Sequence, residues 1–336
     1  MREFSRFHRR LGTDVQVRQL RVTIAIAFAG SAFVAACKTA AAASTGSVSM
    51  LAEAVHSWIG TVSEIFLVVG YLAARRPADS EHPLGYGRES FVWSLFASIV
   101  MFVVGAQIAI WRGISQLGSA ETPNDYRFGY AVIGVSFVLQ QVSFLRAVRF
   151  VRARAAERNS GIFKHVFDTS DSQLRAVVIG DFISLVGLVV AGLGMALHQL
   201  TGKAVYDAMG SILIGLLMGV AGLFLINQNR RYLAGVPLSD ERSAMAVQAI
   251  EKDPRVERVT YFFAEFVGPD RLLVAARVVI AGEPTQVELA RILHELELRV
   301  MEHKSVARAI FALATPEDMA MPGAPRQDVA TASTVT

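Results

Sequence analysis

The sequence predicts an all-α bundle of six transmembrane helices, followed by a small α+β domain with the element order helix–strand–strand–helix–strand. Three observations lead to this fold class. The chain of 336 residues is 53% hydrophobic and only 18% charged, which is too apolar for a soluble protein. It contains six apolar stretches, each near the roughly 20 residues that cross the hydrocarbon core as a helix. After Arg231 the composition changes to that of a soluble domain.

The apolar stretches are expected to be helices because lipid offers no hydrogen-bonding partner to a bare backbone group. They are Val22–Ala43, Val48–Ala74, Phe91–Ile114, Phe128–Phe150, Gln173–Leu200 and Ala208–Ile226. We therefore expect a six-helix transmembrane domain over residues 21–232.

Positive charge indicates the orientation, because Lys and Arg accumulate in cytoplasmic loops. The basic residues gather before the first stretch, between the second and third, between the fourth and fifth, and after the sixth. They include Arg2, Arg6, Arg9, Arg10, Arg18, Arg21, Arg75, Arg76, Arg88, Arg152, Arg154, Arg158, Lys164, Arg230 and Arg231. Both termini are therefore predicted to be cytoplasmic in a multi-pass protein of the cell (plasma or inner) membrane, with residues 1–20 as a basic segment. The formal net charge of +4 mostly reflects this bias, so the partner it indicates is the lipid bilayer and not a nucleic acid.

The soluble domain is expected over residues 236–315. Helical spacing covers Leu238–Glu251, and strands are predicted at Arg258–Phe266 and Arg271–Ala281 around a Gly-Pro-Asp turn. An amphipathic helix over Thr285–Met301 begins with a capping-box pattern, and Val306–Leu313 is the last strand. This order packs as one sheet with helices on one face. The Ala-, Pro- and Thr-rich tail over residues 316–336 is predicted to be disordered.

Polar residues inside the second stretch form the first candidate site. An ionisable group within a membrane costs free energy, so it persists where it faces a protein interior or a solute path. Glu53, His56, Gly60 and Glu64 follow one another by three or four residues and lie on one helix face. His56 and Glu64 are about 12 Å apart along the axis, so they cannot bind one ion, but they could be two stations on one path. The single cysteine, Cys37, excludes an intramolecular disulfide and a cysteine-based metal cluster.

The fifth stretch supplies a carboxylate, Asp181, with Gly180, Ser184 and Gly187 beside it. Small residues there allow other helices to approach closely. A histidine and a carboxylate from two spans suit Zn²⁺, and tolerate Fe²⁺, Co²⁺ or Mn²⁺. We therefore predict His56 and Asp181 as metal ligands. The level of Asp181 along the bundle matches either His56 or Glu64.

Several motifs resemble those of the cation diffusion facilitators, the zinc and related metal-ion/proton antiporters. They are Lys38, the segment Gly46–Ser57 (GSVSMLAEAVHS), His82–Arg88 (HPLGYGR), Asp181–Gly187, Asp207–Ser211 and the turn Gly268-Pro269-Asp270. The resemblance implies a homodimer that pairs through its cytoplasmic domain, which would be ferredoxin-like or metallochaperone-like. It implies divalent cation efflux by metal/proton antiport with alternating access. It implies neither an enzymatic activity nor a tightly bound cofactor. Glu53 and Glu64 would line the transport path.

The chain departs from the family pattern at three positions. In the second stretch, family members generally carry a carboxylate four residues after the histidine (or aspartate) that matches His56, where this chain has Gly60. In the fifth stretch, they usually carry a second ligand besides the aspartate that matches Asp181, at the position of either Val177 or Gly180. Zinc sites typically use three or four protein ligands. The alternative is therefore a non-transporting, regulatory or assembly member of the same family.

Overall fold

The computed structural model describes residues 25–118, 125–157, 161, 166–167, 169–315 and 318. The chain divides into two compact units. The first unit holds most of the long helices. The second holds the sheet together with Gly70–Val92 and Ser170–Ser172. The basic segment over residues 1–20 lies outside the described residues, as does the predicted disordered tail except for residue 318. The predicted domain bounds remain a prediction.

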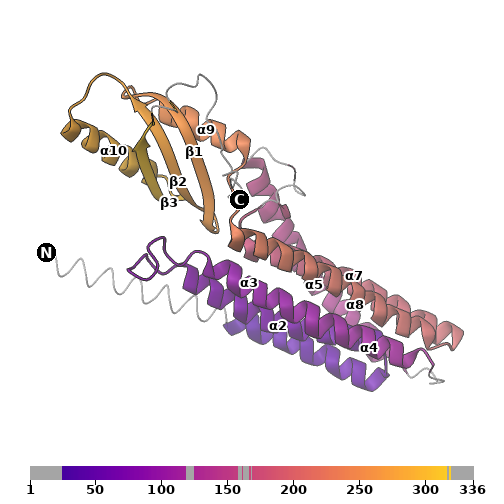
Figure 1. Ribbon diagram of the computed structural model, residues 1–336. Coiled ribbons are helices and arrows are strands. Elements are labelled where there is room, and N and C mark those ends of the chain that lie inside the picture. The colour runs from indigo at the N-terminus through magenta and orange to yellow at the C-terminus, as the bar shows by residue number, and fades with distance from the viewer. Residues whose placement is uncertain are drawn as a thin grey trace, which may run out of the picture. The chain divides into compact units, whose positions relative to one another are not determined.

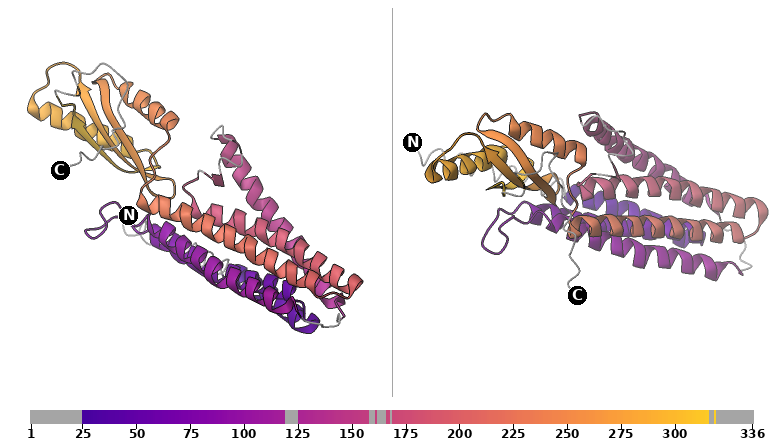
Figure 2. Two further views of the ribbon diagram at one scale, coloured as in Figure 1. Left: turned by 45° about the vertical axis from the view of Figure 1, so that its right-hand side comes forward. Right: turned by 45° about the horizontal axis from the view of Figure 1, so that its top comes forward.

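In the described part of the chain, six helices are long and apolar enough to cross a membrane, which confirms the predicted bundle (Figures 1 and 2). They are Ala25–Thr45; α2, Val48–Ala74; α3, Glu89–Val100, continued by the π-helical turn η1, Met101–Ala106, and by α4, Gln107–Gln116; α5, Arg127–Glu157; α7, Ser172–Thr201; and α8, Val205–Ala234. The bounds predicted for α2 are correct. The predictions for α5 and α8 stopped too early, because hydropathy marks the apolar part of a helix and not the polar turns that continue it.

Asp207 of α8 stabilises the turn between the helix Ala25–Thr45 and α2. Gly46 adopts a φ of 68°, a left-handed conformation that glycine takes at the lowest cost. The Asp207 carboxylate accepts hydrogen bonds from the Ser47 hydroxyl at 2.8 Å, from the Val48 backbone N–H at 2.7 Å and from the Ser49 hydroxyl. A carboxylate at a helix N-terminus pairs with otherwise unsatisfied N–H groups and suits the helix dipole. Asp207 thereby fastens the start of α2 to α8.

Glycines let α8 approach the third span closely. A Cβ at Gly215 would lie 2.7 Å from the side chain of Ile110, and one at Gly222 would lie 2.8 Å from that of Phe102. Both distances are shorter than a real contact, so a larger residue would push the helices apart. In lipid, the hydrophobic effect does not drive one helix against another. Helices associate there through close van der Waals packing, which small residues allow.

The second unit contains a three-stranded sheet in the order β1-β2-β3, which confirms the predicted α+β domain. β1 (Val256–Gly268) pairs antiparallel with β2 (Arg271–Ile280), and β2 pairs parallel with β3 (Val306–Leu313). The helices are α9 (Asp240–Glu251) and α10 (Gln286–Met301). The predicted capping box before α10 is present, since Thr285 and Glu288 each accept the other's backbone N–H.

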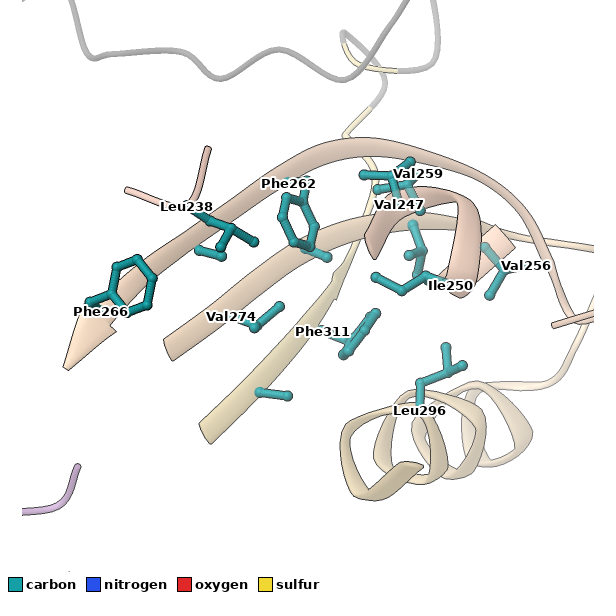
Figure 3. Packing of buried hydrophobic residues seen from close by; sticks show 14 of the residues in the cluster. Leu238, Val247, Ile250, Val256, Val259, Phe262, Phe266, Val274, Leu296 and Phe311 are labelled. Carbon is teal, nitrogen blue, oxygen red and sulfur yellow. The ribbon is translucent and has the colours of Figure 1, made fainter. Parts of the chain in front are cut away.

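One apolar core joins both helices to the sheet (Figure 3). Val247 and Ile250 of α9 and Leu296 of α10 are buried against the same face as Phe262 and Phe311 of the strands. Burial alternates over residues 262–266 of β1 and 274–278 of β2, so every second side chain of these segments enters the core. The domain therefore has a hydrophobic core of its own.

The loop between α2 and α3 is ordered around Asp79 and contacts the β1–β2 hairpin. Asp79 accepts hydrogen bonds from the His82 backbone N–H at 2.8 Å and from the Tyr86 hydroxyl at 2.8 Å, and these bonds hold the pKa of Asp79 below its usual value. The His82 ring packs on Tyr86 with centroids 4.0 Å apart. Arg88 donates to Glu265 of β1 at 2.6 Å. The HPLGYG motif thus has a structural function in this loop.

Candidate metal centre

A cavity of ≈ 480 Å³ lies within the helical unit. The helix Ala25–Thr45, α2, the third span, α5, α7 and α8 all contribute to its wall. Its polar and glycine lining includes Ser31, Lys38, His56, Gly60, Glu64, Gln140, Ser143, Gly180 and Asp181. The cavity thus brings together His56, Glu64 and Asp181 of the predicted site. Glu53 is not among the described residues that line it.

Helices α2 and α7 run antiparallel along this cavity. Near one end, Gln173 of α7 donates a hydrogen bond to the backbone carbonyl of Leu67 at 2.9 Å. Further along, Gly187 lies against the Glu53 carboxylate. The numbering therefore rises on α7 as it falls on α2. This arrangement decides which polar groups meet.

His56 lines the cavity and has a buried ring nitrogen without a partner in the described part of the chain. The side chain is only 6% exposed, and its Nδ1 makes no hydrogen bond with the described residues. Neutral imidazole is a common metal ligand through either ring nitrogen. His56 therefore keeps capacity for a cation.

Glu53 lies behind the lining, in a buried ion pair. Its Oε2 is 2.8 Å from the ammonium nitrogen of Lys38, and the two side chains are 1% and 2% exposed. Its other oxygen, Oε1, has no hydrogen-bond partner among the described residues. Glu53 and Lys38 are the charged groups that act most strongly on His56. Lys38 itself lines the cavity.

Asp181 is held by uncharged donors from α5. Gln140 Nε2 donates to its Oδ1 at 2.6 Å, and the Ser143 hydroxyl donates to its Oδ2 at 2.8 Å. Glu64 of α2 accepts a hydrogen bond from the Ser31 hydroxyl at 2.6 Å, and it is close enough to Asp181 for the two charges to repel each other. Asp181 thus faces Glu64 and not the Lys38–Glu53 pair.

The direction of the side chains explains this division. In an α-helix each Cα–Cβ bond tilts toward the N-terminus. Because α2 and α7 are antiparallel, His56 tilts toward the Val48 end of the bundle, and Asp181 tilts the opposite way, toward Glu64. The backbone of Gly180 meets His56, while the side chain of the next residue points to the level of Glu64. The cavity consequently has a histidine end and a carboxylate end.

Gly60 and Gly180, which stand where the family pattern has metal ligands, leave empty space in the cavity. A Cβ at Gly60 or at Gly180 would meet no heavy atom within 4 Å, and both glycines line the cavity, as does Val177. Within the described parts of the chain, no three His, Cys, Asp or Glu residues lie close enough to hold a metal ion together. An ion bound here would therefore have at most two His, Cys, Asp or Glu ligands from the described residues.

Sequence reasoning missed Gln140 and Ser143 on α5, and gave Lys38 no place in the site. A signal was present, because Gln140 and Ser143 are polar, lie three residues apart and share a face within an apolar span. Their partner on another helix could not be read from spacing along one helix.

Comparison with known proteins gives a family model and a set of relatives that includes the following three. The model described as "Cation efflux transmembrane domain" matches residues 24–234. Metal tolerance protein C4 of Arabidopsis thaliana is 30% identical over 234 residues, which is 70% of this chain and 51% of that protein. The human mitochondrial proton-coupled zinc antiporter SLC30A9 is 26% identical over 275 residues, 82% of this chain and 47% of that protein. The chain thus spans about half the length of these two relatives. Magnetosome protein MamB of Paramagnetospirillum magneticum is 23% identical over 233 residues, 67% of this chain and 71% of that protein.

Proposed function

Because the chain belongs to the cation efflux family, the cation diffusion facilitators, we propose that it moves a divalent metal cation across a membrane in exchange for protons. The cargo is Zn²⁺ or a similar ion, and the reaction involves no enzymatic step. The name of one relative, a proton-coupled zinc antiporter, supports both the ion and the coupling. The chain works as a homodimer with alternating access. It lies in the cell membrane with both termini cytoplasmic, as the basic loops indicate.

One observation carries this proposal: His56 of α2 and Asp181 of α7 line the same cavity. His56 offers an Nδ1 that has no hydrogen-bond partner among the described residues, and Asp181 offers a carboxylate that accepts hydrogen bonds from the exchangeable amide of Gln140 and hydroxyl of Ser143. Nitrogen and carboxylate oxygen are the ligands that Zn²⁺ and its neighbours accept. The cation passes from one to the other, and Glu64 extends the path beyond Asp181. Metal entry displaces protons, since both ligands bind metal only when deprotonated.

The test is flux in liposomes that contain the purified full-length chain. Uptake of Zn²⁺, Mn²⁺ and Fe²⁺ is followed with a fluorescent chelator, with and without a pH gradient. We expect uptake of at least one metal, driven by the gradient and abolished by His56→Ala. His294→Ala, an exposed histidine of α10, is the matched control and should behave as wild type. Absence of flux for every metal, unchanged by His56→Ala, would falsify the transport proposal.

A second function is favoured by Gly60, Gly180 and the missing third ligand. A relative that no longer transports would act as a regulatory or assembly partner through its α+β domain. It would bind no divalent metal at the cavity, and His56→Ala would leave its association with a partner unchanged. The same flux measurement separates the two functions, because only the transporter responds to His56.

A further inference from the structure

The buried pair of Lys38 and Glu53 has no role in the path described above. A buried ion pair is seldom a source of net stability, because removing both charges from water costs about as much as their attraction returns. Here the pair is nearly fully enclosed, with side chains 2% and 1% exposed, and it lies one helical turn from His56. Its position suggests a function in the site rather than in the fold.

The surroundings of Glu53 are shaped for a carboxylate with one oxygen left open. A Cβ at Gly187 of α7 would clash with Glu53 Oε1, so the glycine lets this oxygen lie directly against α7. Oε1 has no hydrogen-bond partner among the described residues, and the same is true of His56 Nδ1. The two residues are about 4.5 Å apart along α2. Two residues three positions apart share one helix face, so their carboxylate and imidazole are two donors that one metal ion could share.

Lys38 puts a fixed positive charge beside these two residues. An ammonium group has three N–H donors and no lone pair, so it cannot bind a metal. It lines the cavity, it occupies Glu53 Oε2 at 2.8 Å, and its charge acts on His56. A divalent cation at His56 therefore meets a fixed positive charge, and the nearest carboxylate is already neutralised.

We propose that Lys38 is a resident cation that keeps Glu53 from becoming a metal ligand, so that a divalent cation at His56 binds weakly enough to leave again. The proposal rests on the proposed function and names the residue that sets the affinity of its site. Lys38 acts through Glu53 and does not touch the cargo, so it is a positioning residue. Without the Lys38 ammonium, His56 and Glu53 would together bind the divalent cation with high affinity and release it slowly.

The experiment measures divalent binding to the detergent-solubilised full chain, with Zn²⁺ and Co²⁺ as probes in equilibrium dialysis. Lys38→Met should tighten binding about tenfold, and Glu53→Gln, which leaves the ammonium unpaired beside His56, should weaken it about tenfold, the scale on which groups around a metal ligand act. The double variant Lys38→Met/Glu53→Gln should bind within about threefold of wild type, because the pair it removes is neutral to the cargo. Lys203→Met, at an exposed position outside the cavity, is the matched control and should change nothing. In liposomes, Lys38→Met should lose flux although it binds more tightly.

The double variant decides the matter even where Lys38→Met does not fold, because it leaves no buried charge unpaired. A tenfold or greater loss of binding in the double variant would identify Glu53 as a ligand in the wild type and overturn the proposal. Tighter binding that persists in the double variant would overturn it as well.

The binding and flux measurements test the two proposals independently. If the variants show the expected changes in binding but the chain gives no flux, the role of Lys38 stands and the transport function fails. If the chain transports but the variants do not show these changes, the transport function stands and the role of Lys38 fails.

Discussion

The sheet domain and the helical bundle each bury a carboxylate, and they satisfy it differently. In the sheet domain Asp253 is 4% exposed and bonded to Arg255 and Arg299, whose guanidinium groups reach its Oδ2 at 2.9 and 2.7 Å. Its Oδ1 accepts the backbone N–H and the Nε–H of Arg255. In the bundle Glu53 is as deeply buried, yet its Oε1 has no partner within the described residues. Burial is thus common to both acids, and only one keeps capacity for a ligand.

This difference separates structural acids from functional candidates. A saturated carboxylate has no lone pair to offer without breaking strong charge-assisted bonds. A carboxylate held by a neutral amide and a hydroxyl, as Asp181 is by Gln140 and Ser143, can exchange those donors for a cation. The partners of a buried acid therefore indicate its function better than its burial does. Four predictions test this distinction.

The largest effect is expected at Asp181. Asp181→Asn removes the charge that would hold the cargo and keeps the size of the side chain. We expect flux to fall by about 100-fold, the upper end of what the loss of a group supporting a metal ligand costs, with the thermal unfolding temperature unchanged. Asp125→Asn is the control, since Asp125 is 71% exposed just before α5. Flux above half the wild-type rate in Asp181→Asn would place the path elsewhere.

The next effect concerns the space at Gly60. Gly60→Asp supplies a carboxylate one helical turn from His56, where no heavy atom lies within 4 Å of the new Cβ. We expect divalent binding to tighten about tenfold, because a third protein ligand completes a shell that zinc prefers. Gly60→Ala adds the same Cβ without the charge and should bind as wild type. Equal binding by both variants would show that position 60 does not face the cargo.

The fold could be predicted from the sequence because it depends on local signals. Hydropathy located all six spans, and turn and capping patterns located the strands and α10. The bounds of α2 were correct because Gly46 and the polar residues before Val48 mark its start in the sequence. The far ends of α5 and α8 carry no such mark, since polar residues there continue the helix.

The candidate site was accessible only in part. Spacing placed Glu53, His56 and Glu64 on one face of α2, which is a property of a single helix. The partners of that face depend on how α2 lies against α7 and the helix Ala25–Thr45. Sequence could not show that Lys38 neutralises Glu53, or that antiparallel tilt sends Asp181 toward Glu64. Whether His56 and Asp181 bind one ion stays a prediction.

A smaller effect is expected at Asp253, and it should appear in stability and not in transport. Asp253→Asn leaves Arg255 and Arg299 without their shared acceptor. We expect the sheet domain to lose about 1.5–3 kcal/mol of unfolding free energy, the range for hydrogen bonds to charged groups, while flux per folded protein stays unchanged. Hydrogen–deuterium exchange of peptides from β1 and α10 reports the loss. Asp240→Asn, in the exposed first turn of α9, should cost less than about 1 kcal/mol. A loss of flux in Asp253→Asn at unchanged exchange would assign this acid a function.

The smallest effect is the dependence of that stability on pH. The side-chain hydrogen bond from Arg255 holds the pKa of Asp253 well below its usual range. Since the folded pKa is the lower one, Asp253 stabilises the fold fully above the ordinary aspartate pKa of about 3.9. The contribution is lost as the pH falls below that value through the folded pKa, because the unfolded chain then binds the proton first.

The difference in protection between wild type and Asp253→Asn should therefore be constant from about pH 7 to pH 5 and shrink below about pH 4. Exchange of the same β1 and α10 peptides, corrected for the intrinsic rate at each pH, gives this curve. A difference that grows toward acid would mean that the folded pKa is raised, as burial without partners would cause. In that case the guanidinium partners would not stabilise the Asp253 carboxylate, and the contrast between the two regions would fail.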